Sequence, residues 1–149
     1  MRQTQDACGG WQADTFIKDG MAVPQGLDDK VRDALSRPVT VVDISTTGRK
    51  SGQERRIEIV MHNIDGRLYI SGQPSRRRRG WLANLDANPK FTLHVKRGAR
   101  ADLPATAREI TDPAERRQVL EHVARNWKRD DVDVMVQYSP LIEVTVPRG

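Results

Sequence analysis

The sequence predicts a mainly β domain of the α+β class, in which six antiparallel strands close into a small barrel with a few flanking helices. Apolar and polar residues alternate along several short segments, as they do in strands that bury one face. Asp65-Gly66 separates two such segments and is a strong signal for a two-residue hairpin turn. The strands follow one another without repeated crossover helices, which favours antiparallel pairing and a small barrel.

The length and composition are those of one folded domain. The chain has 149 residues, of which 37% are hydrophobic and 30% charged, so it can bury a single core and is not depleted enough to be disordered. We expect this domain to span residues 28–149. Residues 1–27 contain several glycines, one proline and no sustained period, and they predict a flexible N-terminal extension.

The expected strands and helices follow from local patterns. The predicted strands are residues 39–44, 56–62, 68–71, 91–95, 103–110 and 140–146. The predicted helices are residues 28–36, a short helix around 81–85, and a longer one that opens at 111–113 and carries the apolar stripe Val119, Leu120, Val123 and Trp127. Pro104 marks its strand as one that begins there or lies at an edge.

Charge and cysteine content narrow the function classes. The formal net charge is +5, a modest excess that attracts anions such as nucleic acid, an acidic membrane surface or phosphorylated metabolites. The excess is concentrated in two loops and aromatic residues are only 5%, so nucleic-acid binding is not expected and membrane association is expected to be weak. The single cysteine, Cys8, and an N-terminus without an apolar signal core predict a cytoplasmic protein.

The segment from Ser45 to Arg55 is the most informative one in the chain. It combines two glycines, several hydroxyls and three cations where the backbone must turn. Turn amides together with Arg and Lys side chains form concavities that bind phosphate or carboxylate. The alternative is an exposed turn whose charges only improve solubility. The segment is not a Walker loop, because Arg49 stands where that motif requires glycine.

A second basic loop, Arg76–Arg79, precedes Trp81. Four adjacent cations repel one another and need an anion or solvent to relax them. Trp81 could stack on a planar ligand or belong to the core, and its spacing does not separate these alternatives.

Other catalytic chemistries find little support in the sequence. His62, His94 and His122 lie too far apart along the chain for a metal motif, and no nucleophile elbow frames a serine. No site for a metal and no catalytic residue is therefore predicted. If the protein is an enzyme, a cofactor carries the chemistry.

Three stretches together resemble the deazaflavin (F420)-dependent nitroreductase and quinone reductase family, whose members share a split β-barrel with flavin-binding oxidases. They are Thr46–Arg55, the stretch from Ser71-Gly72 through Trp81–Leu85 to Asn88-Pro89, and the terminal strand from Pro140. The resemblance covers roughly residues 38–147. It implies an enzyme that transfers a hydride from reduced coenzyme F420 to a quinone, a nitro compound or another conjugated small-molecule acceptor.

The resemblance also implies the coenzyme-binding residues. Arg49, Lys50, Ser51 and Arg55 would hold the phosphate and acidic tail of the coenzyme. Ser71, Gly72, Gln73 and the ring of Trp81 would border the phosphate and the deazaflavin head. The chain departs from the family pattern at Gly72–Ser75, where a Lys-Gly-Gly stretch is common, and in having at most Tyr138 among the substrate-side tyrosines.

Two alternatives stay open at the level of sequence. One is an FMN-dependent oxidoreductase on the same barrel, and the other is a non-catalytic basic module that binds nucleic acid or acidic membrane through Arg76–Arg79. Barrels of this kind commonly pair, so a homodimer is expected.

Overall fold

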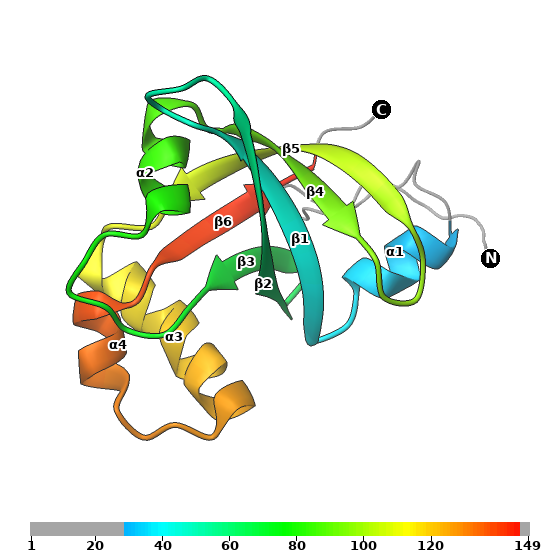
Figure 1. Cartoon of the computed structure of the whole chain (residues 1–149). Helices are drawn as coiled ribbons and strands as arrows, with labels where there is room; N and C mark the ends of the chain where they lie inside the picture. Colours follow the sequence, from blue (N-terminus) through cyan, green and yellow to red (C-terminus); the bar gives the residue numbers. More distant parts are fainter. Residues whose placement is uncertain (1–28, 147–149) are drawn as a thin grey trace.

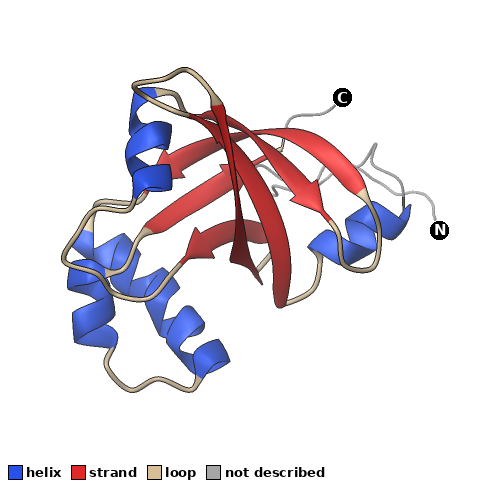
Figure 2. Cartoon of the chain, in the orientation of Figure 1, coloured by secondary structure: helices blue, strands red, loops and turns tan. Residues whose placement is uncertain are grey.

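The computed structural model describes residues 29–146, and the expected N-terminal extension, residues 1–27, lies outside this part of the chain. Within these described residues, six antiparallel strands form a closed barrel in the order β1-β2-β3-β6-β5-β4, with four helices around it (Figures 1 and 2). The elements are α1 Asp29–Leu35, β1 Val39–Thr47, β2 Glu54–Ile64, β3 Arg67–Ser71, α2 Gly80–Ala87, β4 Lys90–Val95, β5 Ala101–Glu109, α3 Pro113–Trp127, α4 Val132–Tyr138 and β6 Leu141–Thr145. The predicted fold class is confirmed.

The barrel core consists of the apolar residues that alternate along the strands. Ile44, Leu93 and Ile142 are among those with no exposed surface. Helix α1 packs on this core where β1 begins, and α2 packs on it where β1 ends, so the two helices cover opposite ends of the barrel (Figure 1). The basic loops predicted from the sequence lie at the α2 end.

The two-residue hairpin is confirmed. Asp65 and Gly66 have φ of 54° and 85°, the left-handed values that a type I′ turn requires at both central positions. Pro104 also lies where its missing N–H is harmless. It pairs with Thr92 of β4, whereas the pairing of β5 with β6 begins only at Thr106.

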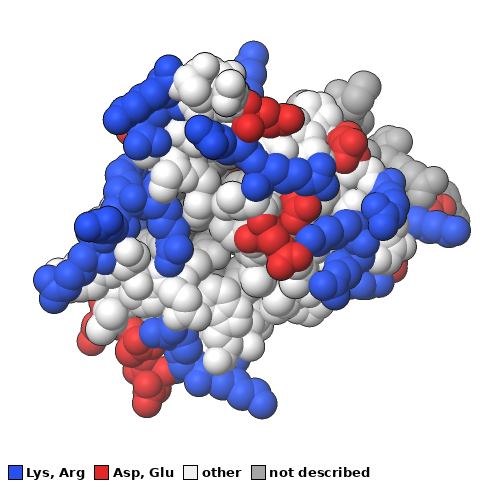
Figure 3. All heavy atoms as spheres, viewed as in Figure 1, with Lys and Arg blue, Asp and Glu red and all other residues white. Residues whose placement is uncertain are grey.

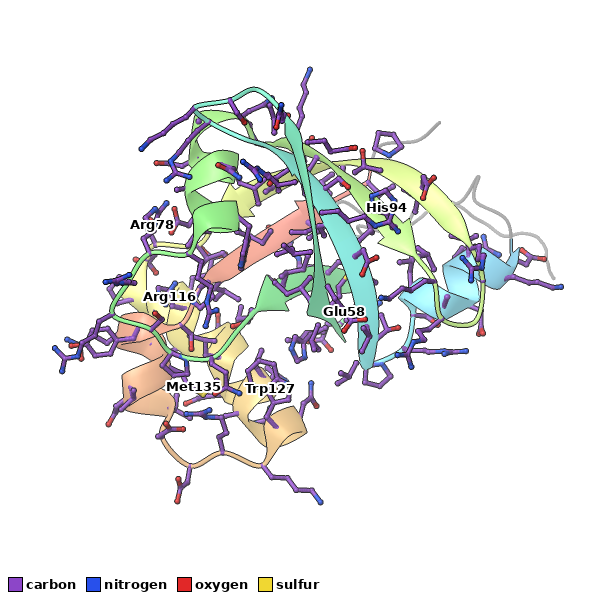
Figure 4. All side chains as sticks on the ribbon, in the orientation of Figure 1. Glu58, Arg78, His94, Arg116, Trp127 and Met135 are labelled. Carbon is purple, nitrogen blue, oxygen red and sulfur yellow. The ribbon has the colours of Figure 1, made fainter. Side chains whose placement is uncertain are left out.

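A second core lies between the barrel and the pair of helices α3 and α4. Tyr69 and Leu141 contribute from the barrel, Leu120 and Val123 from α3, and Met135 from α4. Figure 4 shows Met135 and Trp127 on the barrel-facing side of these helices. The stripe predicted for α3 is confirmed, and Asp112 caps this helix by accepting from the backbone N–H of Glu115 at 2.9 Å.

The expected number of helices, three, was wrong because α4 was missed. The segment contains three β-branched valines, Val132, Val134 and Val136, and residues of this type favour strands over helices. Met135 is fully buried in the second core, so packing rather than local propensity determines this helix. The first hairpin also differs from its predicted bounds. Its strands extend to Thr47 and from Glu54, so the connecting loop is only residues 48–53 and Arg55 lies on β2.

Candidate functional site

The loop between β1 and β2 is closed by its own backbone. Gly48 N–H donates to the carbonyl of Gln53 at 2.8 Å, and Gly52 N–H donates to the carbonyl of Gly48 at 2.8 Å. A side chain at position 48 would place its Cβ 2.7 Å from Ser51 Oγ, and Gly52 has φ of 71°. Both glycines are therefore required by the tight path of the loop.

Most N–H groups of this loop are satisfied within the protein. Besides the two glycines, Gln53 N–H donates to Ser51 Oγ at 3.1 Å, and Arg49 N–H donates to Asn84 Oδ1 at 3.1 Å. This differs from the expectation of a concavity built from consecutive amides. The groups that this loop leaves available for an anion are therefore mainly its side chains.

The side chain of Asn84 fastens the loop to α2. Its amide oxygen accepts from both the backbone and the guanidinium of Arg49, the latter at 3.0 Å, and its amide nitrogen donates to Thr46 Oγ1 at 3.2 Å. Asn84 is buried. The sequence analysis missed this residue, although an asparagine inside a short helix, next to Leu85, indicates a specific hydrogen-bonding role.

Lys50 and Arg55 remain available to a ligand. Both side chains are exposed, and neither forms an ion pair or a hydrogen bond with another described residue. Arg55 lies close to the loop, since its Nε is 3.8 Å from the Cβ position of Gly48. These two cations, with Arg49 beside them, form a positively charged edge of the loop.

The second predicted group of residues connects β3 to α2. Ser71 is buried, and its hydroxyl donates to the carbonyl of Pro140 at 2.7 Å. Gln73 accepts from Arg79 through its carbonyl and from Arg129 through its side chain. At Gly72 a Cβ would lie 3.3 Å from the Pro140 ring, so the chain passes close to the start of β6.

Trp81 lies in the first turn of α2 and packs against the barrel core while remaining partly exposed. The two alternatives were that Trp81 belongs to the core or that it stacks on a planar ligand. Trp81 contacts the core and is also partly accessible at the α2 end of the barrel, so its position is compatible with both.

Helix α2 lies between the two basic loops. The first is fastened to it through Asn84, and the second, residues 72–79, runs directly into its N-terminus. Lys and Arg side chains gather over this part of the molecule, at the top and left of the view in Figure 3. The loops therefore flank one element at one end of the barrel, rather than lying on opposite sides of the molecule.

A pocket of about 330 Å³ lies beneath the arginine run. We call it the arginine pocket. Its lining comprises Ser75–Arg79, Leu82, Glu109–Thr111, Arg116 and Gln137–Pro140. None of the eight residues predicted to bind the coenzyme belongs to this lining.

One wall of the arginine pocket is a partly buried arginine, Arg116, which was not among the residues predicted from the sequence. Arg116 donates to the carbonyls of Ile110, Val136 and Ser139, at 2.9, 2.8 and 2.6 Å, and so joins the end of α4 to the end of β5. Its burial lowers the pKa of Arg116. Figure 4 shows Arg116 and Arg78 on the same side of the molecule. Arg116 shares the helical spacing of the apolar stripe of α3, and a cation on that face was a usable sign of burial.

Two buried histidines lie outside this region. His94 Nδ1 contacts Asp102 Oδ1 at 2.7 Å, and its Nε2 contacts Ser45 Oγ at 2.7 Å. The order Ser-His-Asp resembles a hydrolytic triad, but Ser45 is only 4% exposed and its backbone lies in a strand paired on both sides. This arrangement offers a substrate neither access nor free amides for an oxyanion, so it fits a structural role.

His62 has no exposed surface and packs edge-on against Trp127, with 5.3 Å between ring centroids. Asn126 donates to its Nδ1 at 3.2 Å, and no described residue pairs with its Nε2. Burial lowers the pKa of His62 to about 4. No group of three or more potential metal ligands lies among residues 29–146. The same residues contain no helix with the length and apolar character of a membrane span.

Comparison with known proteins places this geometry in context. Residues 23–147 match the family model described as F420H2-dependent quinone reductase. The match includes the whole barrel, both basic loops and the arginine pocket.

Solved structures share the fold at low sequence identity. An F420H2-dependent reductase, FDR-A, is 22% identical, with a TM-score of 0.52 and coverage of 72% of this chain and 94% of its own. A structure described as an F420 reductase is 15% identical, with a TM-score of 0.59 and coverage of 85% and 97%. A third, described as a domain-swapped dimer, is 22% identical, with a TM-score of 0.55 and coverage of 74% and 81%.

Proposed function

Because the chain belongs to the F420H2-dependent quinone reductase family, and is thus an F420-dependent oxidoreductase, we propose that it reduces a quinone, a nitro compound or another conjugated small molecule. The observation that supports this assignment is the exposed cationic edge of the first loop, beside a partly exposed indole on α2. An acidic coenzyme tail and a planar coenzyme head require these two features.

The described residues fit coenzyme F420. Lys50 and Arg55 have no partner among the described residues, and the phosphate and carboxylates of the coenzyme would supply one. Arg49 is held by Asn84, so its charge is fixed in position before a ligand arrives. Ser51 still has a hydroxyl hydrogen to donate, because its oxygen acts as an acceptor within the loop.

The residues between the two loops would hold the head of the coenzyme. Ser71 and Gly72 are fixed against Pro140, and Gln73 is held by Arg79 and Arg129. Trp81 is partly exposed in the first turn of α2, the helix that this loop enters, and its ring would offer a flat apolar surface there. A rigid border of this kind would orient a planar ring without chemical participation of a side chain.

When bound, reduced F420 supplies a hydride, which carries two electrons. The protein would align the acceptor with the coenzyme and exclude water from the contact. The arginines of the second loop would stabilise the negative charge that develops on the acceptor. We assign no side chain as proton donor, and water completes the reduction.

The first experiment measures binding and turnover. Titration of the protein with reduced F420, oxidised F420 and FMN should show binding of the deazaflavin forms, with FMN at least tenfold weaker. Addition of menadione to protein and reduced F420 should then restore the visible absorbance of the oxidised coenzyme. Tight FMN binding without deazaflavin turnover would assign the barrel to flavin chemistry instead.

A double variant tests the role of the first loop. Lys50→Ala with Arg55→Ala should weaken binding of reduced F420 by at least tenfold at low salt, and the difference from the native protein should shrink as salt increases. Arg97→Ala with Arg100→Ala removes the same charge from exposed positions in the turn between β4 and β5 and serves as the matched control. Equal effects of the two double variants would mean that only net charge matters.

The chain is also proposed to pair with a second copy of itself. The support is the solved structure described as a domain-swapped dimer, which shares the fold.

A further inference from the structure

The arginine pocket holds more positive charge than the protein itself neutralises. Five of its lining residues are arginines, Arg76–Arg79 and Arg116, and its one carboxylate is Glu109. Glu109 already forms a bidentate pair with Arg78, at 2.9 and 3.1 Å, and this hydrogen bonding raises the pKa of Arg78. The negative charge of the pocket is thus committed to one arginine.

The other four arginines have no carboxylate partner within the described part of the chain. Arg116 is occupied by backbone carbonyls, and Arg76 lies over the ring of Tyr138, 5.3 Å from its centroid. Arg79 donates to the Gln73 carbonyl through Nη2, while its Nε has no acceptor among the described residues. Arg77 makes no side-chain hydrogen bond or ion pair with residues 29–146.

The wall of the pocket contains one further unpaired donor. Ser139 is 4% exposed, and its hydroxyl has no partner among residues 29–146. Buried polar groups are normally paired, so unpaired donors in the wall of a cationic pocket favour an acceptor within it. The loop that carries the arginines is also held in place, because Ser75 N–H donates to the Tyr138 carbonyl at 3.0 Å.

The arginine pocket shares no lining residue with the proposed coenzyme contacts, although its Arg79 donates to the carbonyl of Gln73 and so joins the two regions. It is lined by the second half of the loop, Ser75–Arg79, whereas the proposed contacts are Ser71–Gln73 and the first loop. Both halves lead into α2, so a molecule in the pocket lies beside the coenzyme region without sharing its cations. A volume of about 330 Å³ is at the lower end for small-molecule sites and suits one or two rings.

We propose that the arginine pocket binds the anionic group of the electron acceptor, so that the substrate class is a conjugated acceptor that carries a carboxylate, a sulfonate or a phosphate. This inference rests on the proposed function and specifies its substrate. The hydride passes from the reduced coenzyme to the conjugated system of the acceptor, and a proton from water balances the charge. The coenzyme is oxidised, the acceptor gains two electrons, and its anionic group is unchanged.

The test compares two acceptors in native and variant protein. The probes are 1,2-naphthoquinone-4-sulfonate and the uncharged 1,2-naphthoquinone, each assayed with reduced F420. In the native protein kcat/KM should be higher for the sulfonate, in a salt-dependent way. Arg77→Gln with Arg79→Gln should lower the ratio of the two kcat/KM values at least tenfold. Use of the ratio cancels the different reactivities of the two quinones.

A matched control and a direct binding measurement complete the design. Arg97→Gln with Arg100→Gln removes the same charge outside the pocket and should leave the ratio within twofold of the native value. Calorimetric titration of naphthoquinone sulfonate without coenzyme should show binding that the pocket variant loses and the control retains. This result would support the pocket even if reduced F420 gave no turnover, which would count against the proposed function alone.

Three outcomes would overturn the inference. In the first, the pocket variant binds the sulfonate as the native protein does. In the second, it loses kcat/KM equally for both quinones. In the third, the variant weakens binding of reduced F420 and leaves the quinone ratio unchanged, which would assign the pocket to the coenzyme. Circular dichroism of both double variants verifies that each is folded.

Discussion

At the scale of single residues, burial in the second core lowers the pKa of His62 and so makes the stability of the fold depend on pH. The side chain is fully buried against Trp127, and its pKa is lowered from 6.5 to about 4. Between these two values the unfolded chain carries a proton on this histidine and the folded chain does not. The unfolded state thus binds more protons, so the free energy of unfolding falls as the pH drops through this window.

We expect this titration to cost about 2 kcal/mol of stability between pH 7 and pH 5. Urea unfolding at a series of pH values measures it. His62→Gln removes the titrating group and should flatten the curve in this window, whereas His122→Gln changes an exposed side chain and should preserve it. An equally steep curve for His62→Gln would assign the dependence to other groups.

The residues of the candidate site differ in how far they could be predicted from the sequence. The glycines and cations of the first loop could be selected from the sequence because glycine indicates a tight backbone turn and Lys or Arg indicates positive charge. The partners that fix them were not, because Asn84 is distant in the chain and meets Arg49 only in the folded barrel. The place of Arg116 on the apolar face of α3 could be read from the sequence, but its carbonyl partners, after β5 and in α4, could not.

At the scale of secondary-structure elements, α2 organises the end of the barrel that carries the candidate site. It packs Leu82 and Leu85 into the barrel core and presents Asn84 to the first loop. The second loop ends at its first residue, Gly80. The position of this short helix thereby determines where both groups of cations lie.

Asn84→Ala tests this organising role. The change removes three hydrogen bonds and leaves the Arg49 N–H without its acceptor, which should lower the free energy of unfolding by about 1–3 kcal/mol. Binding of reduced F420 should weaken as well, because Arg49 is no longer held. Asp86→Ala on the same helix, at an exposed position, should change stability by no more than about 0.5 kcal/mol.

Helices, strands and turns were predictable where neighbouring residues determine the backbone conformation. They were not predictable where tertiary packing determines it. The turn at Asp65-Gly66 is local and is confirmed, and the start of α3 within residues 111–113 is set by an equally local cap, Asp112. Helix α4 was missed because Met135 and the second core stabilise it against the preference of its valines. The ends of β1 and β2 extend beyond the predicted strands because pairing with each other continues through Thr47 and Glu54.

At the scale of the whole molecule, β6 closes the barrel. It pairs with β3 through Ile70 and Ile142 and with β5 from Thr106 onward. This strand is the last of those in residues 29–146, yet its neighbours are the third and fifth strands, so closure joins distant parts of the sequence. An antiparallel barrel could be predicted from hairpins and alternation, but the partners of β6 could not, since no local signal specifies them.

Ile142→Ala measures the contribution of this closure. The side chain has no exposed surface, and its truncation should reduce the free energy of unfolding by about 2–5 kcal/mol, measured by urea unfolding. Thr145→Ala, at an exposed position on the same strand, should cost less than about 1 kcal/mol. A small effect of Ile142→Ala would show that the barrel tolerates a cavity where β6 meets β3.

The hairpin of β1 and β2 has a consequence for how such enzymes change. Nine consecutive residue pairs, from Val39 with His62 to Thr47 with Glu54, follow one another without a bulge. The pairing of these two strands therefore extends up to the six connecting residues, 48–53, and does not include them. We therefore expect that this short loop, part of the coenzyme contacts proposed above, can be exchanged without loss of the paired strands, and that such an exchange changes which electron carrier the protein prefers.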